Sequence, residues 1–484
     1  MNRQNVEPQS RLLSGSVRIF LAESLILPTG LITTAILTRT LGPAGYGTFT
    51  LAATAVSWIE WSIAAMFARA SFIHVARAVD WRPVATTLVR MRLSVSFAGA
   101  AGLALLAGPI AALLGEPALE GFLRLFAIDI PLFSAAQAHA NVLVGIGAFG
   151  RRAWLTVSRV FARLVLIAAL VGLGFSIEGA IWASIGASTV ELIVARRFVK
   201  PHIFRRSAFP ATLLWQQALP LTLFAVTTRL FDKMDLFFLQ ALGGSSELAG
   251  FYGGAQNLSI VPALVSMSFS PVLLSSISRL LRDGAEGDAR ALAMEALRWT
   301  VALVPFVAIA AAASPEIVRL VLGEAFDGAA RPMSLLVFAA AAMVIVSAGT
   351  AVLMAAGKSM WAVYLTGPMV PLAAAGHVLL IPRFGASGAA SVTLIVATST
   401  ALATLAAIHR LWGVVPPGLT FVRSATLSVM AYVMTAGWPA AGLMVPLKLA
   451  AVSIVVACAF LMVGEQMPAY RRLSSGGDNS RMPT

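Results

Sequence analysis

Four ionisable residues lie close together in a stretch of the chain that is otherwise apolar and long enough to cross a membrane. The stretch covers residues 214–244, and its second half contains Arg229, Asp232, Lys233 and Asp235. A charge at membrane depth costs about 2.5–3.5 kcal/mol on insertion scales, so such residues usually face a bundle interior or a wet cavity. At helical spacing Arg229 and Lys233 share one face, and Asp232 lies one turn from Arg229. The pattern predicts a polar face directed into the protein.

A second interpretation of the same stretch stays open. If the helix ends near Thr228, the four charged residues sit in the outer headgroup layer and need no partner inside the protein. Under either interpretation the stretch 214–244 opens the second half of an internal repeat.

Other ionisable residues also fall within predicted membrane segments. Arg159 and Arg163 lie one turn apart on one face, near the inner end of their helix, so they either extend to the headgroups or line an inward-facing cavity. Glu23, Glu60 and Asp129 are candidate coupling or cavity-lining carboxylates. The candidate substrate-binding residues are Arg159, Arg163, Arg229, Asp232, Lys233 and Asp235.

This mixture of charges indicates a class of ligand. Arg and Lys can neutralise phosphate, while carboxylates can bind hydroxyls or carry a coupling proton. A cavity with both suits an anionic, hydroxyl-rich head group. An exporter of lipophilic cations would instead be expected to have a cavity dominated by carboxylates.

The composition places these residues in a membrane protein. The chain has 484 residues, of which 58% are hydrophobic and 12% charged, against about 25% charged residues in soluble domains. Because roughly 20 apolar residues span a bilayer, the sequence predicts an all-α, polytopic protein with about fourteen transmembrane helices. The predicted windows are 16–38, 46–67, 93–114, 121–146, 153–174, 176–196, 214–240, 249–277, 297–314, 333–356, 359–381, 386–409, 420–438 and 445–466.

The net charge of +14 is distributed unevenly across these helices. The outer loops contain Arg39, Arg319, Arg331 and Arg383, whereas most of the other basic residues fall in the tails and inner loops. This asymmetry predicts that both termini are cytoplasmic. The basic residues therefore indicate topology and attraction to anionic lipids, and no nucleic acid partner. The loop around residues 69–92 mixes arginines with apolar residues and predicts a short amphipathic helix at the inner interface.

The two halves of the chain repeat the same landmarks. Gly45 pairs with Gly250, Gly115 with Gly323, Gly150 with Gly357 and Gly179 with Gly388, and the offsets between paired residues stay between 205 and 209. Each unit has about six helices, so both copies enter the membrane from the same side, as in transporters built from parallel repeats.

These landmarks predict the domain organisation. Residues 1–14 form a disordered cytoplasmic tail, and 198–213 form a basic cytoplasmic linker. The N-lobe is expected at 15–197, the C-lobe at 214–410, an extra helix pair at 420–466 and a second cytoplasmic tail at 467–484.

No motif in the chain supports catalysis. It lacks a GxxxxGK[ST] phosphate loop, and its five histidines are scattered singly. The one cysteine, Cys458, excludes an intrachain disulfide and a cysteine metal cluster. His139 and His377 lie in membrane windows and are candidates for proton handling, beside a simpler structural role. We expect no enzymatic activity, cofactor or metal.

Four segments resemble a known family: RTLGPAGYGTFTLA, FDKMDLFFLQALGGSSELAGFYGGAQNLS, LVLGEAFDGAARPMSLL and LLIPRFGASGAASVT. They are similar to the polysaccharide transport proteins of the multidrug/oligosaccharidyl-lipid/polysaccharide flippase superfamily, over about residues 15–466. The resemblance implies two six-helix lobes in a V around a central cavity. It also implies movement of undecaprenyl-diphosphate-linked oligosaccharide from the inner to the outer leaflet.

We therefore expect a monomeric flippase of the bacterial inner membrane, acting by alternating access in exopolysaccharide, O-antigen or capsule assembly. Its expected partners are the lipid-linked oligosaccharide, membrane lipids, a polysaccharide polymerase and glycosyltransferases. Two alternatives stay open: an ion-coupled multidrug exporter of the same superfamily, and a non-transporting scaffold for polysaccharide assembly.

Overall fold

The computed structural model of the protein describes residues 18–201, 209–210, 212, 215, 233–414 and 416–462. These residues form helices joined by short turns, with no strand among them. Within this part of the chain, nine helical stretches are long and apolar enough to cross a membrane. The predicted all-α, polytopic membrane fold is confirmed.

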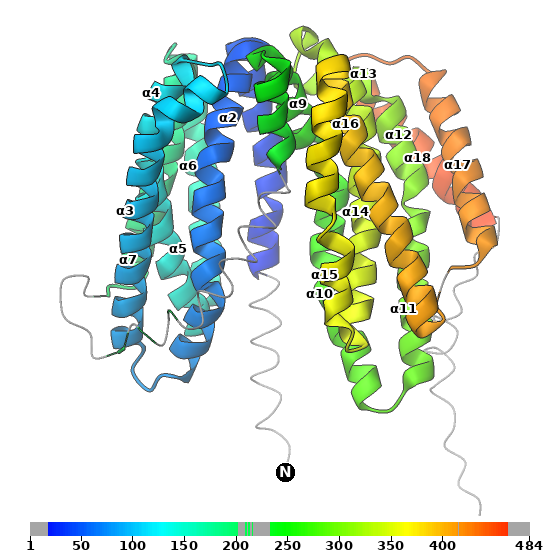
Figure 1. Cartoon of the computed structure of the whole chain (residues 1–484), viewed down its shortest axis with the longest axis horizontal. Helices are drawn as coiled ribbons and strands as arrows, with labels where there is room; N and C mark the ends of the chain where they lie inside the picture. Colours follow the sequence, from blue (N-terminus) through cyan, green and yellow to red (C-terminus); the bar gives the residue numbers. More distant parts are fainter. Residues whose placement is uncertain are drawn as a thin grey trace, which may run out of the picture.

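Figure 1 shows two helical bundles side by side. The first bundle, blue to teal, ends near residue 198, where the predicted N-lobe ends. Its helices are α2 (Ile26–Arg77), α3 (Trp81–Leu113), α4 (Ala118–Phe126), α5 (Asp129–Gly145), α6 (Phe149–Gly172) and α7 (Ser176–Phe198).

The second bundle, green to orange, begins in the described residues with the helical segment 233–243. Helices α17 (Gly418–Ala436) and α18 (Met444–Met462) lie on its far side, where α17 packs against α12. The bundle contains α9 (Ser246–Leu258), α10 (Val261–Arg282), α11 (Glu286–Ala302), α12 (Val304–Ala312), α13 (Ser314–Val321), the 3-10 helix η1 (Glu324–Ala329), α14 (Ala330–Ala355), α15 (Ser359–Thr366) and α16 (Met369–Trp412).

Two of the longest helices each contain a sharp break at a glycine. Helix α2 breaks at Gly42, with φ 66°, and α16 breaks at Gly385, with φ 55°. Only glycine adopts a positive φ at little cost, so the helix direction changes there. Each break separates two of the predicted membrane windows, so α2 and α16 each cover two windows in one continuous stretch.

The predicted interfacial helix around residues 69–92 is wrong. Helix α2 continues to Arg77, and α3 begins at Trp81, after Asp80 accepts a hydrogen bond from the backbone nitrogen of Arg82 at 3.0 Å. This cap starts a new membrane helix directly. Arg92 is consequently buried inside the bundle, because the apolar residues between the arginines pack against neighbouring helices.

Glycines with positive φ occur at corresponding places in the two bundles. They follow the first, third, fourth and fifth membrane segments of each bundle in turn, and the pairs are Gly42 and Gly244, Gly115 and Gly323, Gly147 and Gly357, and Gly174 and Gly385. By backbone conformation the counterpart of Gly357 is thus Gly147, three residues before the sequence landmark Gly150. This shared order of helices and turns supports the proposal that the bundles are copies of one unit.

The bundles contact each other at one end, where α4, α9 and α13 lie (top of Figure 1). At the crossing of α2 and α9, a Cβ added at Gly47 would lie 1.8 Å from the Ser246 carbonyl oxygen. The Asn257 amide donates to the Tyr46 hydroxyl at 2.7 Å, and Arg39 donates to the Leu320 carbonyl at 2.7 Å. This end of the molecule, called the closed end below, is therefore tightly packed.

Candidate functional site

A cluster of buried charges lies inside the first bundle. It comprises Glu60 of α2, Asp129 of α5, Arg159 and Arg163 of α6, and Glu191 of α7. The three carboxylates are 5%, 2% and 1% exposed. The other four charged groups are all electrostatic neighbours of Glu60. The cluster thus gathers three acids and two bases from four helices.

Arg159 is held by contacts directed into the bundle. Its Nε lies 3.5 Å from Oε2 of Glu191, and its guanidinium lies over the Phe133 ring, 4.3 Å from the centroid. Gln137 donates to the other oxygen of Glu191 at 3.3 Å. These contacts favour the interpretation that the α6 arginines line the interior over the one that sends them to the headgroups.

Several atoms of this cluster have capacity for further hydrogen bonds. Among the described residues, Glu60 Oε1, Asp129 Oδ1 and Arg163 Nε are buried and make no hydrogen bond. Buried polar atoms nearly always have partners. Unsatisfied acceptors and a donor close together suit a site that takes up a proton, water or a polar ligand.

A second polar network lies in the other bundle, centred on Asp235. This residue is 5% exposed, and its Oδ2 accepts from the Tyr252 hydroxyl at 2.5 Å and from the Gln256 amide at 2.8 Å. Lys233 donates to the Gln256 oxygen at 2.7 Å, and the Tyr252 hydroxyl lies 3.4 Å from Thr393 Oγ1. The network joins the segment 233–243 to α9 and α16.

This geometry bears on the two interpretations of the stretch 214–244. Asp235 is buried in the protein and hydrogen-bonded to α9. This favours the interpretation that the polar face is directed into the protein over the one that places it in the headgroup layer. Arg229 and Asp232 lie outside the described residues.

The structure brings some predicted residues together and leaves others apart. Glu60, Asp129, Arg159 and Arg163 form one cluster, and Lys233 and Asp235 belong to the other. Glu23 lies in the helical segment 18–24, just before α2, and is exposed. It contacts neither cluster through a charge pair among the described residues.

Sequence reasoning missed Glu191 and the neutral members of both networks. Glu191 lies within the predicted window 176–196, so the cost of a charge at membrane depth would have selected it. Gln137, Tyr252, Gln256 and Thr393 carry no charge and give no comparable signal.

The two buried histidines stand apart from each other. His139 Nδ1 lies 2.7 Å from the Ala135 carbonyl of its own helix, and the His377 ring lies 5.7 Å from that of Phe238. In the described part of the chain, no group of three or more His, Cys, Asp or Glu residues is placed to hold a metal ion.

Comparison with known proteins identifies a family and a fold for the chain. The sequence profile of the family described as "Polysaccharide biosynthesis protein" matches residues 36–331. A search of curated proteins gave no match.

Solved structures with a similar fold cover almost the whole chain. The lipid II flippase MurJ, in an inward closed conformation, has a TM-score of 0.68 and 13% identity, over 93% of this chain and 98% of that one. An inward-facing multidrug resistance MATE transporter of the MOP superfamily has a TM-score of 0.60 and 15% identity, over 86% and 94%. A MOP superfamily transporter from Pyrococcus furiosus has a TM-score of 0.56 and 15% identity, over 88% and 96%.

Proposed function

The chain belongs to the polysaccharide biosynthesis protein family, and we propose that it is a flippase for undecaprenyl-diphosphate-linked oligosaccharide. Family and fold point to a multi-pass membrane transporter rather than a catalytic enzyme. The substrate would move from the inner to the outer leaflet of the bacterial inner membrane. Exopolysaccharide, O-antigen or capsule assembly would use the product.

The observation that carries this proposal is the buried mixed-charge cluster of the first bundle. Arg159 and Arg163 would neutralise the diphosphate, and Glu60, Asp129 and Glu191 would accept hydrogen bonds from sugar hydroxyls or carry a coupling proton. Lys233 and Asp235 would supply a second polar surface on the opposite lobe. The head group would pass between the lobes while its isoprenoid chain stays among apolar groups.

The packing of the two bundles supports a mechanism by alternating access. With the termini in the cytoplasm, as the loop charges favour, the closed end is the outer one. The cavity would then open inward, take up the head group, and release it outward when one bundle rocks against the other and the contacts of the closed end separate. An ion gradient or downstream polymerisation would drive the cycle. The transporter would act as a monomer, beside a polymerase and glycosyltransferases.

The test is complementation of a strain that lacks this gene. Compared at equal amounts of protein in the membrane, Arg159→Ala should abolish surface polysaccharide and cause lipid-linked precursor to accumulate. Arg151→Ala is the matched control, because Arg151 is an exposed arginine on the same helix. Full surface polysaccharide in the Arg159 variant would show that the proposed cavity is wrong.

A multidrug exporter is the second candidate. The first cluster holds more carboxylates than arginines, and the fold is similar to that of MATE transporters. Proteoliposomes separate the two functions: an exporter expels cationic dyes and leaves lipid-linked oligosaccharide in its original leaflet. A scaffold for polysaccharide assembly would do neither.

A further inference from the structure

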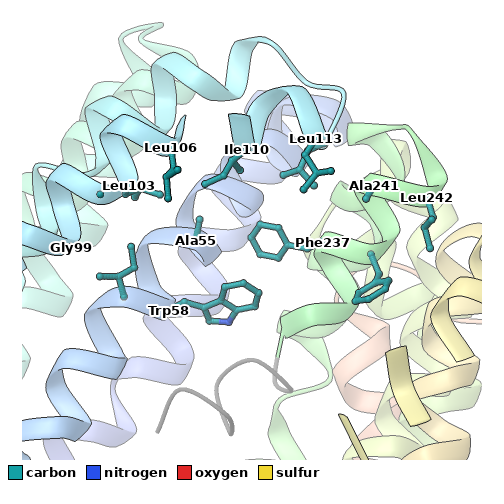
Figure 2. A pocket seen from close by; sticks show the side chains of 14 residues that line it. Ala55, Trp58, Gly99, Leu103, Leu106, Ile110, Leu113, Phe237, Ala241 and Leu242 are labelled. Carbon is teal, nitrogen blue, oxygen red and sulfur yellow. The ribbon is translucent and has the colours of Figure 1, made fainter. Parts of the chain in front are cut away.

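An apolar groove lies between the two bundles, near the closed end. Its volume is about 670 Å³, within the range of about 300–1,000 Å³ that is usual for ligand pockets. Figure 2 shows its walls: α2 and α3 of the first bundle on one side and the segment 233–243 of the second bundle on the other. A ligand in this groove would therefore touch both bundles.

The floor of the groove joins the bundles through two aromatic rings. Trp58 of α2 stacks on Phe237, with ring centroids 4.6 Å apart. At the other limit of the groove, the Gln240 amide donates to the Leu114 carbonyl at 3.1 Å. Between these contacts the lining is hydrocarbon, with Leu103, Leu106 and Leu113 along α3.

The groove is open along its side. Leu106 is 56% exposed and Leu113 is 76% exposed, and both lie on a helix that crosses the membrane. Hydrocarbon chains, rather than water, meet such a surface. A ligand that enters the groove from this side would therefore be part of a lipid.

One polar group lies at the floor of the groove, on the lower edge of the Trp58 ring (Figure 2). The Trp58 indole N–H is buried and makes no hydrogen bond with the described residues, although a buried indole usually finds an acceptor. Trp58 lies two residues before Glu60, and Phe237 lies two residues after Asp235. At 1.5 Å of rise per residue, Trp58 and Glu60 differ by about 3 Å in position along their helix axis, and so do Phe237 and Asp235.

We propose that this groove holds the isoprenoid chain of the lipid-linked oligosaccharide, with its phosphate end at the level of Trp58. This inference rests on the proposed function. A head group bound between the lobes tethers its own chain beside the groove, which raises the local concentration of that chain above that of bulk phospholipid. The chain then lies against both lobes.

The experiment uses the full-length protein in nanodiscs, with a polyisoprenyl monophosphate that carries a photoreactive diazirine in its chain. Illumination should label the peptide that contains Leu103–Leu114. Unlabelled polyisoprenyl monophosphate should compete, and phosphatidylglycerol should not. Labelling elsewhere, or equal competition by phosphatidylglycerol, would overturn the inference.

Two variants of α3 make the test specific to the groove. Gly102 lines the groove, and a Cβ added there meets no atom within 4 Å, so Gly102→Trp fills the space without a backbone clash. We expect it to reduce labelling by about tenfold or more. Leu105→Trp is the matched control, since Leu105 is 78% exposed on the same helix but lies outside the lining. Unchanged labelling of a folded Gly102→Trp protein would contradict the proposal.

Transport assays distinguish failure of this inference from failure of the proposed function. If labelling maps to the groove but proteoliposomes with wild-type protein do not flip lipid-linked oligosaccharide, the proposed function fails and the lipid site stands. If the protein flips this substrate while labelling lies outside the groove, the function stands and the site is wrong.

Discussion

At the scale of single residues, the pairing of Arg159 with Glu191 decides how the first cluster behaves. Glu191 is almost fully buried, and the guanidinium also covers the Phe133 ring. Removing one member of a buried ion pair leaves the other charge uncompensated and destabilises the protein. Replacing both members can leave the free energy of unfolding nearly unchanged. The contribution of this pair to stability can therefore be measured separately from its contribution to transport.

We predict that Arg159→Met lowers the free energy of unfolding by about 3–5 kcal/mol, because Glu191 is left charged and buried. The double variant Arg159→Met/Glu191→Gln should recover most of this stability and still fail to transport. Thermal unfolding in detergent, with flipping in proteoliposomes, measures both. A double variant as unstable as the single one would show that the two residues do not act as a pair.

Arg92 is a buried charged residue without a hydrogen-bond partner among the described residues. It is 0% exposed, and none of its three guanidinium nitrogens makes a hydrogen bond with the described residues. Because a buried unpaired charge is costly, we predict that Arg92→Met raises the melting temperature. Arg82→Met, at an exposed position of the same helix, should leave it nearly unchanged. A lower melting temperature for Arg92→Met would mean that Arg92 has a stabilising partner.

At the scale of helices, the closed end depends on the close approach of α2 and α9. Glycines face each other there: a Cβ at Gly250 would lie 2.0 Å from the Pro43 carbonyl oxygen. Ser246, at the start of α9, also donates to the Glu116 carboxylate. Only residues without a side chain allow this packing.

We predict that Gly47→Ala separates the bundles at the closed end, because the added methyl group would overlap the Ser246 carbonyl. In a Cys458→Ala background, the cysteine introduced by Ser246→Cys should react faster with a membrane-impermeant maleimide when Gly47→Ala is also present. Gly30→Ala is the control, since a Cβ there meets no atom within 4 Å. Equal reaction rates in the two variants would exclude a gate at this crossing.

The last two helices are attached to the second bundle by an ion pair. Lys448 of α18 is 1% exposed, and its Nζ lies 2.7 Å from both carboxylate oxygens of Glu316 in α13. The Ala440 backbone N–H donates to the same carboxylate at 3.1 Å. The pair holds α18 against the closed end of the bundle.

We predict that Lys448→Met destabilises the protein by about 3–5 kcal/mol, since Glu316 loses its charged partner. Limited proteolysis of the segment between α17 and α18 should accelerate in this variant. Arg410→Met, at an exposed end of α16, should leave the rate unchanged. If Lys448→Met is cut no faster than wild type, the ion pair does not hold the helix pair in place.

At the scale of the whole molecule, hydropathy and glycine placement were sufficient to predict the helical membrane fold. The breaks at Gly42 and Gly385 fall between predicted windows because glycine in a positive φ changes the direction of a helix. The predicted interfacial helix failed because local composition does not reveal that α3 starts at its Asp80 cap. Arg92, assigned to that interface, is buried instead.

The candidate site was only partly predictable for a related reason. Spacing places Arg159 and Arg163 on one face of a helix, but the rotation of that helix against its neighbours depends on packing between distant segments. From the sequence alone, these arginines could therefore extend either to the headgroups or into an inward-facing cavity. Their acidic partner Glu191 is contributed by another helix and was recognised only in the structure.

The central claim is that this two-bundle protein moves a lipid-linked oligosaccharide through its charged interior. Purified protein in proteoliposomes, with labelled undecaprenyl-diphosphate-linked oligosaccharide in one leaflet, tests it most directly. We predict that the head group becomes accessible to a glycosidase on the opposite side, and that Arg159→Ala abolishes this while Arg151→Ala does not. Efflux of cationic dyes with no movement of the oligosaccharide would contradict the claim.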